Sequence, residues 1–319
     1  MKKIYITDYI TDPYVEAKIL SDHFVKDIKD KDIEVLLVWN QIVDDDFLNK
    51  FPKLKGIVRY GVGYDKINIE AVKKRNLVVC NTPDYAMEEV SDTALGMLLN
   101  ITRALNLYDH ISRKSLEKWK QNTPIKEIKR NNLNKIGVIG AGRIGSLFIK
   151  KAESIGFEVH YFDPYLKENI NHGRRVKTLD ELLSLSDIIS IHTPLTDETL
   201  GLVDESFLSK MKTGSSIINT ARGKIIKNLD IIYDCLKSNK LYSVAFDVLP
   251  DEPPHKNKLI SSWINRDEIS PRIMINPHVS YYSNESFIEC REKASLNALS
   301  IINNNEPKNI IYDFRKWKK

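Results

Sequence analysis

Cysteine is scarce in this sequence, and its three copies are not arranged for disulfide or metal bonding. Cys80, Cys235 and Cys290 lie far apart, are odd in number, and have no C-x-x-C pair or histidines at ligand spacing. This pattern argues against a disulfide framework and against a zinc site, and it favours reduced thiols. No apolar run is long enough to span a bilayer, and the basic start MKKIYITDY lacks the apolar stretch of a signal peptide. We therefore expect a cytoplasmic protein.

The sequence also lacks internal repeats, low-complexity segments and a dominant charge of one sign. Hydrophobic residues make up 42% and charged residues 29% of 319 residues, which describes a globular chain of two domains. The net charge of +5 suits anionic ligands, but Lys and Arg are scattered among acidic residues. Lys126–Lys135 and Arg315–Lys319 could touch nucleic acid or a membrane. An exposed linker and a fraying terminus are the interpretations that we favour, so we expect neither partner.

A glycine motif stands where a strand turns into a helix. The stretch from Lys135 to Asp163 reads as strand, glycine turn, helix and strand, with G-x-G-x-x-G formed by Gly140, Gly142 and Gly145. The first glycine permits the turn, the second lets the backbone approach a pyrophosphate, and the third lets the helix sit close to the strand. Phosphates would rest on the helix N-terminus. This context predicts a dinucleotide-binding unit.

The next strand ends in an acid at the expected distance from the glycines. Asp163 follows the aromatic run Tyr161 and Phe162, at the spacing of the carboxylate that binds the adenosine ribose hydroxyls. A carboxylate there repels a 2′-phosphate, so the sequence favours NAD over NADP. The alternative is a turn residue that ends the strand before Pro164.

Strands and helices alternate on both sides of this motif, which predicts α/β domains with parallel sheets. In the first hundred residues, the strand-like runs are 4–7, Val35–Trp39, Gly56–Tyr60 and Val78–Cys80, with a helical stretch at Tyr14–Lys29. After Asp163, the strands are Ile188–His192, Ser216–Thr220, Ser243–Asp247 and Ile273–Asn276, and the helices are Asp180–Leu183, Glu205–Met211 and Leu229–Leu236. Met87–Ser112 reads as one long helix that joins the two domains.

Three strand ends in the second half carry residues that suit the reduction of a 2-oxo acid. Arg222 follows one strand, Glu252 lies in the loop after the next, and His278 stands in the turn Asn276-Pro277-His278. Arginine can bind a carboxylate through two parallel N–H bonds and polarise the neighbouring carbonyl. Histidine can donate a proton, and a glutamate beside it would favour its protonated form and orient the ring. Singly, each residue is more often a surface ion pair or a capping group.

Taken together, the motifs resemble the D-isomer-specific 2-hydroxyacid dehydrogenases over nearly the whole chain. They are GAGRIG, Asp163, HTPLTDET at His192–Thr199, NTARG at Asn219–Gly223, DVLPDEP at Asp247–Pro253, NPHVS at Asn276–Ser280, RYGVGYD at Arg59–Asp65 and VSDTA at Val90–Ala94. The branch that resembles this chain most is that of the C-terminal-binding proteins and their phosphoglycerate-dehydrogenase-like bacterial relatives.

The resemblance implies two Rossmann-like or flavodoxin-like domains joined by long interdomain helices. Residues 1–100 with 286–319 would form the substrate domain, and 101–285 the NAD-binding domain, in a molecule that is usually a homodimer. Closure of the domains would bring Gly61–Gly63 over the nicotinamide and exclude water.

The resemblance also assigns residues to roles. Arg222, His278 and Glu252 would be the catalytic set: the carboxylate-binding arginine, the acid/base and its partner. The same Arg222 and His278, with Arg59, Val62 and Gly63, would bind the substrate. The positions that match the NAD site are Thr93, Gly140, Gly142, Arg143, Ile144, Gly145, Asp163, Thr193, Pro194, Thr199, Thr220, Ala221, Arg222, Asp247, His278 and Ser280.

Some positions depart from the family pattern, and the substrate stays open. Tyr281 stands where the C-terminal-binding proteins usually have tryptophan, and Lys224 replaces a common glycine. Residues around Tyr60, Tyr64, Tyr85, Met87 and Tyr281 are expected to form the side-chain pocket, although core packing explains the tyrosines equally well.

The leading hypothesis is an NAD-dependent enzyme that interconverts a small 2-oxo acid and its D-2-hydroxy acid. One alternative is an NAD(H)-sensing interaction protein with little turnover. A second is an oxidoreductase acting on a non-carboxylate anion such as phosphite.

Overall fold

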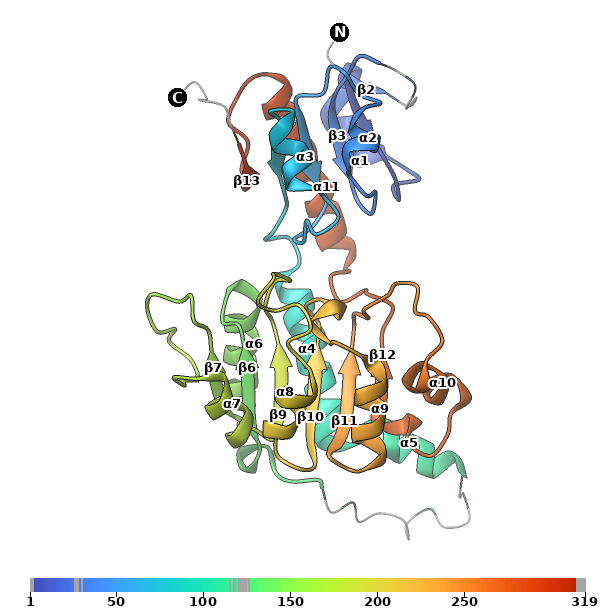
Figure 1. Ribbon diagram of the computed structural model, residues 1–319, viewed down its shortest axis with the longest axis vertical. Helices are drawn as coiled ribbons and strands as arrows, with labels where there is room; N and C mark the ends of the chain where they lie inside the picture. Colours follow the sequence, from blue (N-terminus) through green and yellow to red (C-terminus); the bar gives the residue numbers. More distant parts are fainter. Residues whose placement is uncertain are drawn as a thin grey trace. The chain divides into compact units, whose positions relative to one another are not determined.

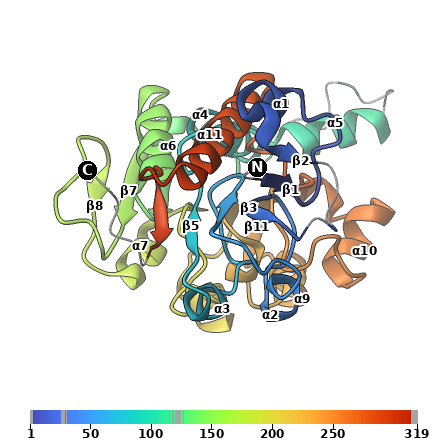
Figure 2. The same cartoon turned by 90° about the horizontal axis from the view of Figure 1, so that it is seen from above.

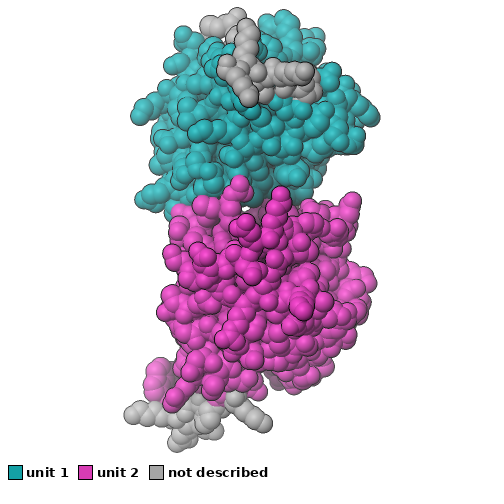
Figure 3. Space-filling model, turned by 90° about the vertical axis from the view of Figure 1, so that its left-hand side faces the viewer, with its two compact units in different colours: residues 1–86, 282–319 teal, residues 87–281 magenta. Residues whose placement is uncertain are grey.

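The computed structural model describes residues 3–25, 29, 31–114, 116, 119, 125 and 127–313. Two compact units make up the chain: Met1–Ala86 with Tyr282–Lys319, and Met87–Tyr281 (Figure 1; Figure 3). Lys126 and the tail Arg315–Lys319, which belong to the two basic segments noted above, lie outside the described residues.

The second unit is built on a parallel sheet of seven strands. The strands are β6 (Lys135–Ile139), β7 (Glu158–Phe162), β8 (Arg174–Arg175), β9 (Ile188–Ile191), β10 (Ser215–Asn219), β11 (Leu241–Phe246) and β12 (Ile273–Ile275). Their order across the sheet is β12-β11-β10-β9-β6-β7-β8, and every pair is parallel. The strand order therefore reverses between β6 and β9. In such sheets, ligands bind outside the carboxyl ends of the strands at this switch point.

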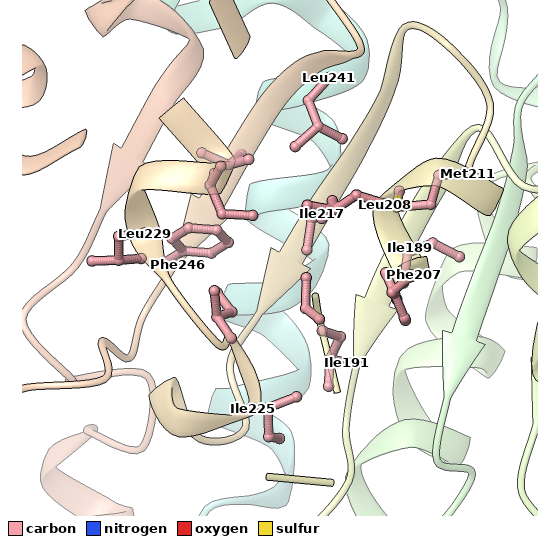
Figure 4. Packing of buried hydrophobic residues seen from close by; sticks show 14 of the residues in the cluster. Ile189, Ile191, Phe207, Leu208, Met211, Ile217, Ile225, Leu229, Leu241 and Phe246 are labelled. Atoms are coloured by element: carbon pink, nitrogen blue, oxygen red, sulfur yellow. The ribbon is translucent and has the colours of Figure 1, made fainter. Parts of the chain in front are cut away.

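Helices cover both faces of this sheet and complete its core. They are α4 (Met87–Arg103), α5 (Leu105–Lys114), α6 (Arg143–Ser154), α7 (Leu179–Leu185), α8 (Glu205–Lys210), α9 (Leu229–Lys237) and α10 (Lys258–Asn265), with short 3-10 helices η3 (Asn131–Leu133), η4 (Gly223–Ile225) and η5 (Ser270–Arg272). On one face, Phe207 of α8 and Leu229 of α9 pack with Ile217 and Phe246 of the sheet (Figure 4). On the other, α4 and α6 pack together over β6 and β10. The central strands β6, β9, β10 and β11 are consequently largely buried on both faces.

The first unit contains a smaller sheet of six strands. They are β1 (Lys3–Ile6), β2 (Phe24–Val25), β3 (Ile33–Val38), β4 (Gly56–Arg59), β5 (Val78–Cys80) and β13 (Ile310–Tyr312), in the order β13-β5-β4-β3-β1-β2. The first five strands are parallel in the flavodoxin-like order, and β13 at the edge is antiparallel to β5. The helices are α1 (Tyr14–Leu20), η1 (Ser21–His23), α2 (Asp45–Leu48), α3 (Ile69–Lys74) and α11 (Asn284–Ile302).

The α/β fold with two doubly wound sheets is as predicted, but two predicted helices are wrong in extent. The helix expected over Tyr14–Lys29 ends at Leu20, because Ser21 has φ 47° and ψ −127°, a conformation in which the α-helix cannot continue. The single helix expected over Met87–Ser112 is broken at Ala104, whose φ is 49°. Neither Ser21 nor Ala104 is Gly or Pro, so the apolar periodicity of the sequence continues past both positions and does not predict the breaks.

The compact units end at other residues than the predicted domains. Helix α4 packs on α6 and therefore belongs to the second unit from its first residue, Met87. The returning segment joins the first unit at Tyr282, where α11 packs beside α1 and along β3 and β4 (Figure 2). The assignment of residues 1–100 with 286–319 to substrate and 101–285 to NAD remains a prediction about roles.

Candidate functional site

The glycine turn follows β6 at the switch point. Gly140 has φ +88°, and a Cβ there would lie 2.8 Å from the carbonyl oxygen of His192. A Cβ on Gly145 would lie 2.0 Å from the carbonyl oxygen of Gly140. Packing therefore requires both glycines, which agrees with the tight turn and the close helix predicted from the motif. Gly142 instead faces open space, with nothing within 4 Å of an added Cβ.

Helix α6 starts directly after Gly142, and Arg143 and Ile144 are its first residues. Free N–H groups and the helix macrodipole favour an anion at this end of a twelve-residue helix. The open side of Gly142 leaves that end accessible. The residues at this turn therefore suit a diphosphate, as the spacing predicts.

Asp163 follows β7 and bonds to the glycine turn. Its Oδ2 accepts a hydrogen bond from the N–H of Ala141 at 2.9 Å, and its Oδ1 accepts one from the N–H of Tyr165 at 2.9 Å. Asp163 thus does cap a turn, which was the alternative interpretation, but the carboxylate keeps further lone pairs for hydroxyl donors. The turn fixes the carboxylate beside the glycine turn, and binding of the adenosine ribose by Asp163 stays a prediction.

Three hydroxyl groups at the carboxyl ends of the strands are buried without a hydrogen-bond partner among the described residues. They belong to Thr193 after β9, Thr220 after β10 and Ser280 after β12. A buried polar group left unpaired costs about 1–3 kcal/mol, so such groups are normally satisfied. All three are positions that the resemblance assigns to NAD. Their chemistry fits a ligand rich in hydroxyl, phosphate and amide groups.

Other predicted cofactor positions have local roles in the structure. Thr199 Oγ1 donates to the carbonyl of Pro194 at 2.7 Å and accepts from the N–H of Thr196 at 2.8 Å, which closes the loop after β9. The N–H of Ala221 bonds to Asn219 Oδ1 at 3.0 Å. Thr93 lies half-buried on α4. These contacts shape the loops around the sheet edge.

The predicted catalytic residues come together at the ends of three neighbouring strands. Arg222 follows β10, Glu252 lies in the loop after β11, and His278 follows β12. The Oε2 of Glu252 lies 2.7 Å from Nδ1 of His278, and its Oε1 accepts from the N–H of Leu249 at 3.1 Å. Nδ1 is thereby directed at the carboxylate, which leaves Nε2 as the nitrogen for proton exchange.

The electrostatics of this pair follow from its neighbours. Burial alone raises the pKa of Glu252, but the hydrogen bond and charge of His278, the Leu249 N–H and, more weakly, Arg222 outweigh it and hold the pKa below the usual range. Glu252 is therefore ionised at neutral pH.

Asp247 has a role that the sequence did not reveal. It is only 2% exposed, and its carboxylate accepts hydrogen bonds from the N–H groups of Val279 and Ser280 at 3.0–3.2 Å. Its carbonyl accepts the N–H of His278 at 2.8 Å, while His278 has φ 56°. Asp247 thus holds the strained turn that presents His278. The signal available was a buried acid ending a strand beside the N-P-H turn, but the pairing of β11 with β12 had to be known.

Close packing fixes the arginine loop against the glutamate loop. A Cβ on Gly223 would lie 1.9 Å from the carbonyl carbon of Leu249, so only glycine fits after Arg222. The amide of Asn219 donates to the carbonyl of Arg222 at 3.0 Å, and Arg222 Nη1 donates to the carbonyl of Ala221 at 2.7 Å. Arg222 and Glu252 are therefore held on adjoining loops.

His192, in the motif after β9, is structural. Its Nε2 lies 2.8 Å from Ser190 Oγ, and its ring packs on Phe148 with centroids 5.0 Å apart. Burial lowers the pKa of His192 to about 3, so the ring is neutral at physiological pH. His192 is therefore unsuited to act as a general acid at neutral pH.

The remaining predicted substrate residues belong to the first unit. Arg59 ends β4, with its guanidinium 6.0 Å from the ring centre of Trp39. Val62 is 40% exposed, and its carbonyl accepts from the amide of Asn81 at 2.7 Å; Gly63 follows it. Of the predicted pocket tyrosines, Tyr60 and Tyr85 are buried, which supports core packing for these two, and Tyr64 is 44% exposed.

Comparison with protein-family models gives one match to residues 95–280. The model describes the D-isomer specific 2-hydroxyacid dehydrogenase, NAD binding domain. The match covers more than half of the chain and contains the glycine turn, Asp163, Arg222, Glu252 and His278.

The part of the chain that the structure describes holds no helix long and apolar enough to cross a membrane.

Curated relatives carry the names of dehydrogenases and reductases of this family. The D-3-phosphoglycerate dehydrogenase of Bacillus subtilis (strain 168) is 31% identical over 307 residues, which are 92% of this chain and 56% of the relative. A glyoxylate reductase of Thermofilum pendens (strain DSM 2475 / Hrk 5) is 31% identical over 294 residues, 90% of this chain and 83% of the relative. The chain spans about half the length of the curated phosphoglycerate dehydrogenases that it matches.

Solved structures give the same result. The D-lactate dehydrogenase of Aquifex aeolicus, complexed with NAD and lactic acid, is 26% identical, with a TM-score of 0.82 over 95% of this chain and 96% of that chain. A glyoxylate/hydroxypyruvate reductase of Sinorhizobium meliloti shares the fold with a TM-score of 0.85 at 22% identity. By its sequence, its fold and the matched NAD-binding domain, the chain belongs to the D-isomer-specific 2-hydroxyacid dehydrogenase family.

Proposed function

We propose that the protein is an NAD(H)-dependent oxidoreductase that interconverts a small 2-oxo acid and its D-2-hydroxy acid. The observation that carries the proposal is the pairing of Glu252 Oε2 with His278 Nδ1 at 2.7 Å. Arg222 follows the neighbouring strand in the same unit. An acid, its ionised partner and a carboxylate-binding arginine are the groups that this reaction needs.

In the direction of reduction, Arg222 binds the substrate carboxylate and polarises the adjacent carbonyl. NADH, held by the glycine turn and Asp163, would supply the hydride for the carbonyl carbon. His278 donates the proton on Nε2 to the carbonyl oxygen, so that oxo acid, NADH and H⁺ become hydroxy acid and NAD⁺. Ionised Glu252 stabilises the imidazolium through Nδ1 before that transfer and receives no proton itself.

Cofactor binding is assigned to the carboxyl edge of the second unit. Gly140, Gly142 and Gly145 with the N-terminus of α6 would hold the pyrophosphate, and Asp163 the adenosine ribose. The unpaired hydroxyls of Thr193, Thr220 and Ser280 support this assignment. The other proposed contacts are Thr93, Arg143, Ile144, Pro194, Thr199, Ala221, Arg222, Asp247 and His278. The carboxylate at Asp163 supports a preference for NAD over NADP.

The first unit would contribute Arg59 and the backbone N–H groups of Val62 and Gly63 to the substrate carboxylate. For assembly we propose a homodimer through the α5 region. None of the side chains of α5 is fully buried, and Leu105 at its start is 55% exposed. Cytoplasmic location remains a proposal that rests on the three unbridged cysteines.

The test of this function is the loss of NADH absorbance with a panel of 2-oxo acids: glyoxylate, hydroxypyruvate, pyruvate, 2-oxoglutarate, phenylpyruvate and 4-methylthio-2-oxobutyrate. We expect turnover with one or more of them, and a loss of about 10²–10⁴-fold in His278→Ala, the usual range for a general acid. NADH binding should survive in the variant. Tight NADH binding without any turnover in the wild type, accompanied by a dinucleotide-dependent change in oligomeric size, would instead support an NAD(H)-sensing interaction protein.

A further inference from the structure

A buried ion pair connects the first and last helices of the first unit. Arg291 of α11 donates from Nε to Oε1 of Glu16 at 2.9 Å and from Nη2 to Oε2 at 2.6 Å. Glu16 is 0% exposed and Arg291 3%. Because desolvation of two charges is costly, apolar residues often stabilise such a place equally well. Stability of the fold alone therefore does not explain why this ion pair is present.

Tyr60 is the third member of this network. Its hydroxyl donates to Oε1 of Glu16 at 2.9 Å, and its side chain is 0% exposed. Burial, followed by the charge and hydrogen bond of Glu16, raises the pKa of Tyr60, so the hydroxyl stays a neutral donor. Tyr60 stands between Arg59 and Gly61, directly after β4. The network thus ends in the loop of residues 59–63, to which the proposed function assigns the substrate carboxylate.

The same loop is also anchored at its next residue, Gly61. The N–H of Gly61 donates to Thr82 Oγ1 at 2.5 Å, and its carbonyl accepts from the N–H of Thr82 at 3.1 Å. Thr82 Oγ1 also lies 3.2 Å from Sγ of Cys290, the neighbour of Arg291 on α11. Cys290 and Arg291, which are consecutive on α11, therefore contact the two residues that hydrogen-bond to this loop. These two residues are Thr82 and Glu16.

The loop and the Arg59 side chain are in direct contact. Gly61 has φ +100°, and a Cβ there would lie 2.3 Å from Nη1 of Arg59. The guanidinium thus lies against the backbone of Gly61. A shift of this backbone would move Arg59 together with the N–H groups of Val62 and Gly63.

We propose that Glu16, Arg291 and Tyr60 form a positioning network that sets the conformation of the loop of residues 59–63 and, through it, the affinity for the substrate carboxylate. The inference rests on the proposed function, which assigns that loop to the carboxylate. The three residues act through the loop. Arg291 lies on α11, in the C-terminal part of the chain. Substrate affinity therefore depends on the packing of α11 against α1, β3 and β4.

Tyr60→Phe tests the network by removing one hydroxyl from a buried ring. We expect a rise of about tenfold in KM for the preferred oxo acid, since small misplacements of binding groups cost this much or more. Oxamate binding to the protein saturated with NADH should weaken equally, whereas NADH affinity and kcat should stay within about twofold. Arg291→Lys should also raise KM, because an ammonium cannot reproduce two parallel bonds. Glu16→Gln should act in the same direction.

Asn297→Ala is the matched control on the same helix. Asn297 is 5% exposed and hydrogen-bonds through its side chain to the backbone N–H and carbonyl of Lys308. We expect a lower Tm without a change in KM. Equal KM values in Tyr60→Phe and Asn297→Ala would overturn the inference, since the network would then only stabilise the unit. A wild type that neither reduces an oxo acid nor binds oxamate would overturn the proposed function itself.

Discussion

Gly142 and Gly145 differ in what a methyl group would meet at each position, although one motif contains both. At Gly145 the Cβ would strike the carbonyl oxygen of Gly140 at 2.0 Å. We expect Gly145→Ala to lower the free energy of unfolding by about 3 kcal/mol, the upper range for overpacking. Gly142→Ala should leave stability nearly unchanged, because nothing lies within 4 Å.

The Gly142→Ala methyl should instead reduce NADH affinity by on the order of tenfold, because it stands at the anion-binding end of α6. Chemical denaturation and NADH fluorescence titration measure the two effects. Unchanged NADH affinity in a folded Gly142→Ala variant would show that the pyrophosphate does not bind at this turn.

Glu252 gives a pH dependence whose sign follows from its lowered pKa. A carboxyl group with a folded-state pKa below its ordinary value of 4.5 stabilises the fold above that value, and this stability is lost as pH falls through the lower pKa. The difference in unfolding free energy between wild type and Glu252→Gln should therefore be largest at neutral pH and shrink below about pH 4.5. Urea unfolding at several pH values measures it, with the exposed Glu168→Gln as control. A difference that grows in acid would contradict the assigned pairing with His278.

At this scale, the sequence motifs predicted which strand ends carry the candidate residues, whose roles stay predictions. Arg222, Glu252 and His278 do converge, because the carboxyl ends of adjacent parallel strands meet at one edge. The structural role of Asp247 was not predictable, since it depends on which strand pairs with β11. Hydrogen bonds made across strands are absent from any single motif.

Among the secondary-structure elements, helix α1 is followed directly by a residue with a strained backbone, Ser21. Exposed Ser21, with φ 47° and ψ −127°, adopts a conformation suited to glycine. We expect Ser21→Gly to raise the free energy of unfolding by about 1 kcal/mol, because the strain of such a residue exceeds the entropic cost of glycine. Thermal unfolding checks this, with Ser21→Ala as the control that keeps the Cβ. A gain in the alanine variant would assign the effect to the hydroxyl.

Strand positions were predicted closely, whereas helix ends were not. Buried strands rich in apolar residues are visible directly in the sequence, as in β3 and β9. The helix ends at Leu20 and Arg103 are set by single residues, Ser21 and Ala104, whose φ is positive. The short strands β2 and β8 have two residues each and carry too little pattern to be predicted.

For the whole molecule, the proposed dimer gives a further prediction. Leu105 begins a helix without a fully buried side chain and is itself 55% exposed. We expect sedimentation velocity to show a dimer in the wild type and a shift toward monomer in Leu105→Glu, because a charge in an apolar contact is left unpaired. NADH binding per chain should be retained. A dimer unaffected by the substitution would place the interface elsewhere.

The division into two units was predictable in outline, because two series of alternating strands and helices require two sheets. The exact crossing points, Ala86 to Met87 and Tyr281 to Tyr282, were not. They depend on the packing of α4 on α6 and of α11 on α1, β3 and β4, which neither periodicity nor a motif reveals.

The stereochemical course of hydride transfer tests the central claim most directly. NADH carrying deuterium at the transferable C4 position is incubated with the oxo acid that turns over fastest, and the hydroxy acid is analysed by mass spectrometry and chiral chromatography. We predict one deuterium at C2 of the D enantiomer in the wild type and almost no labelled product in His278→Ala. An L product, an unlabelled product or undiminished labelling in His278→Ala would contradict the account.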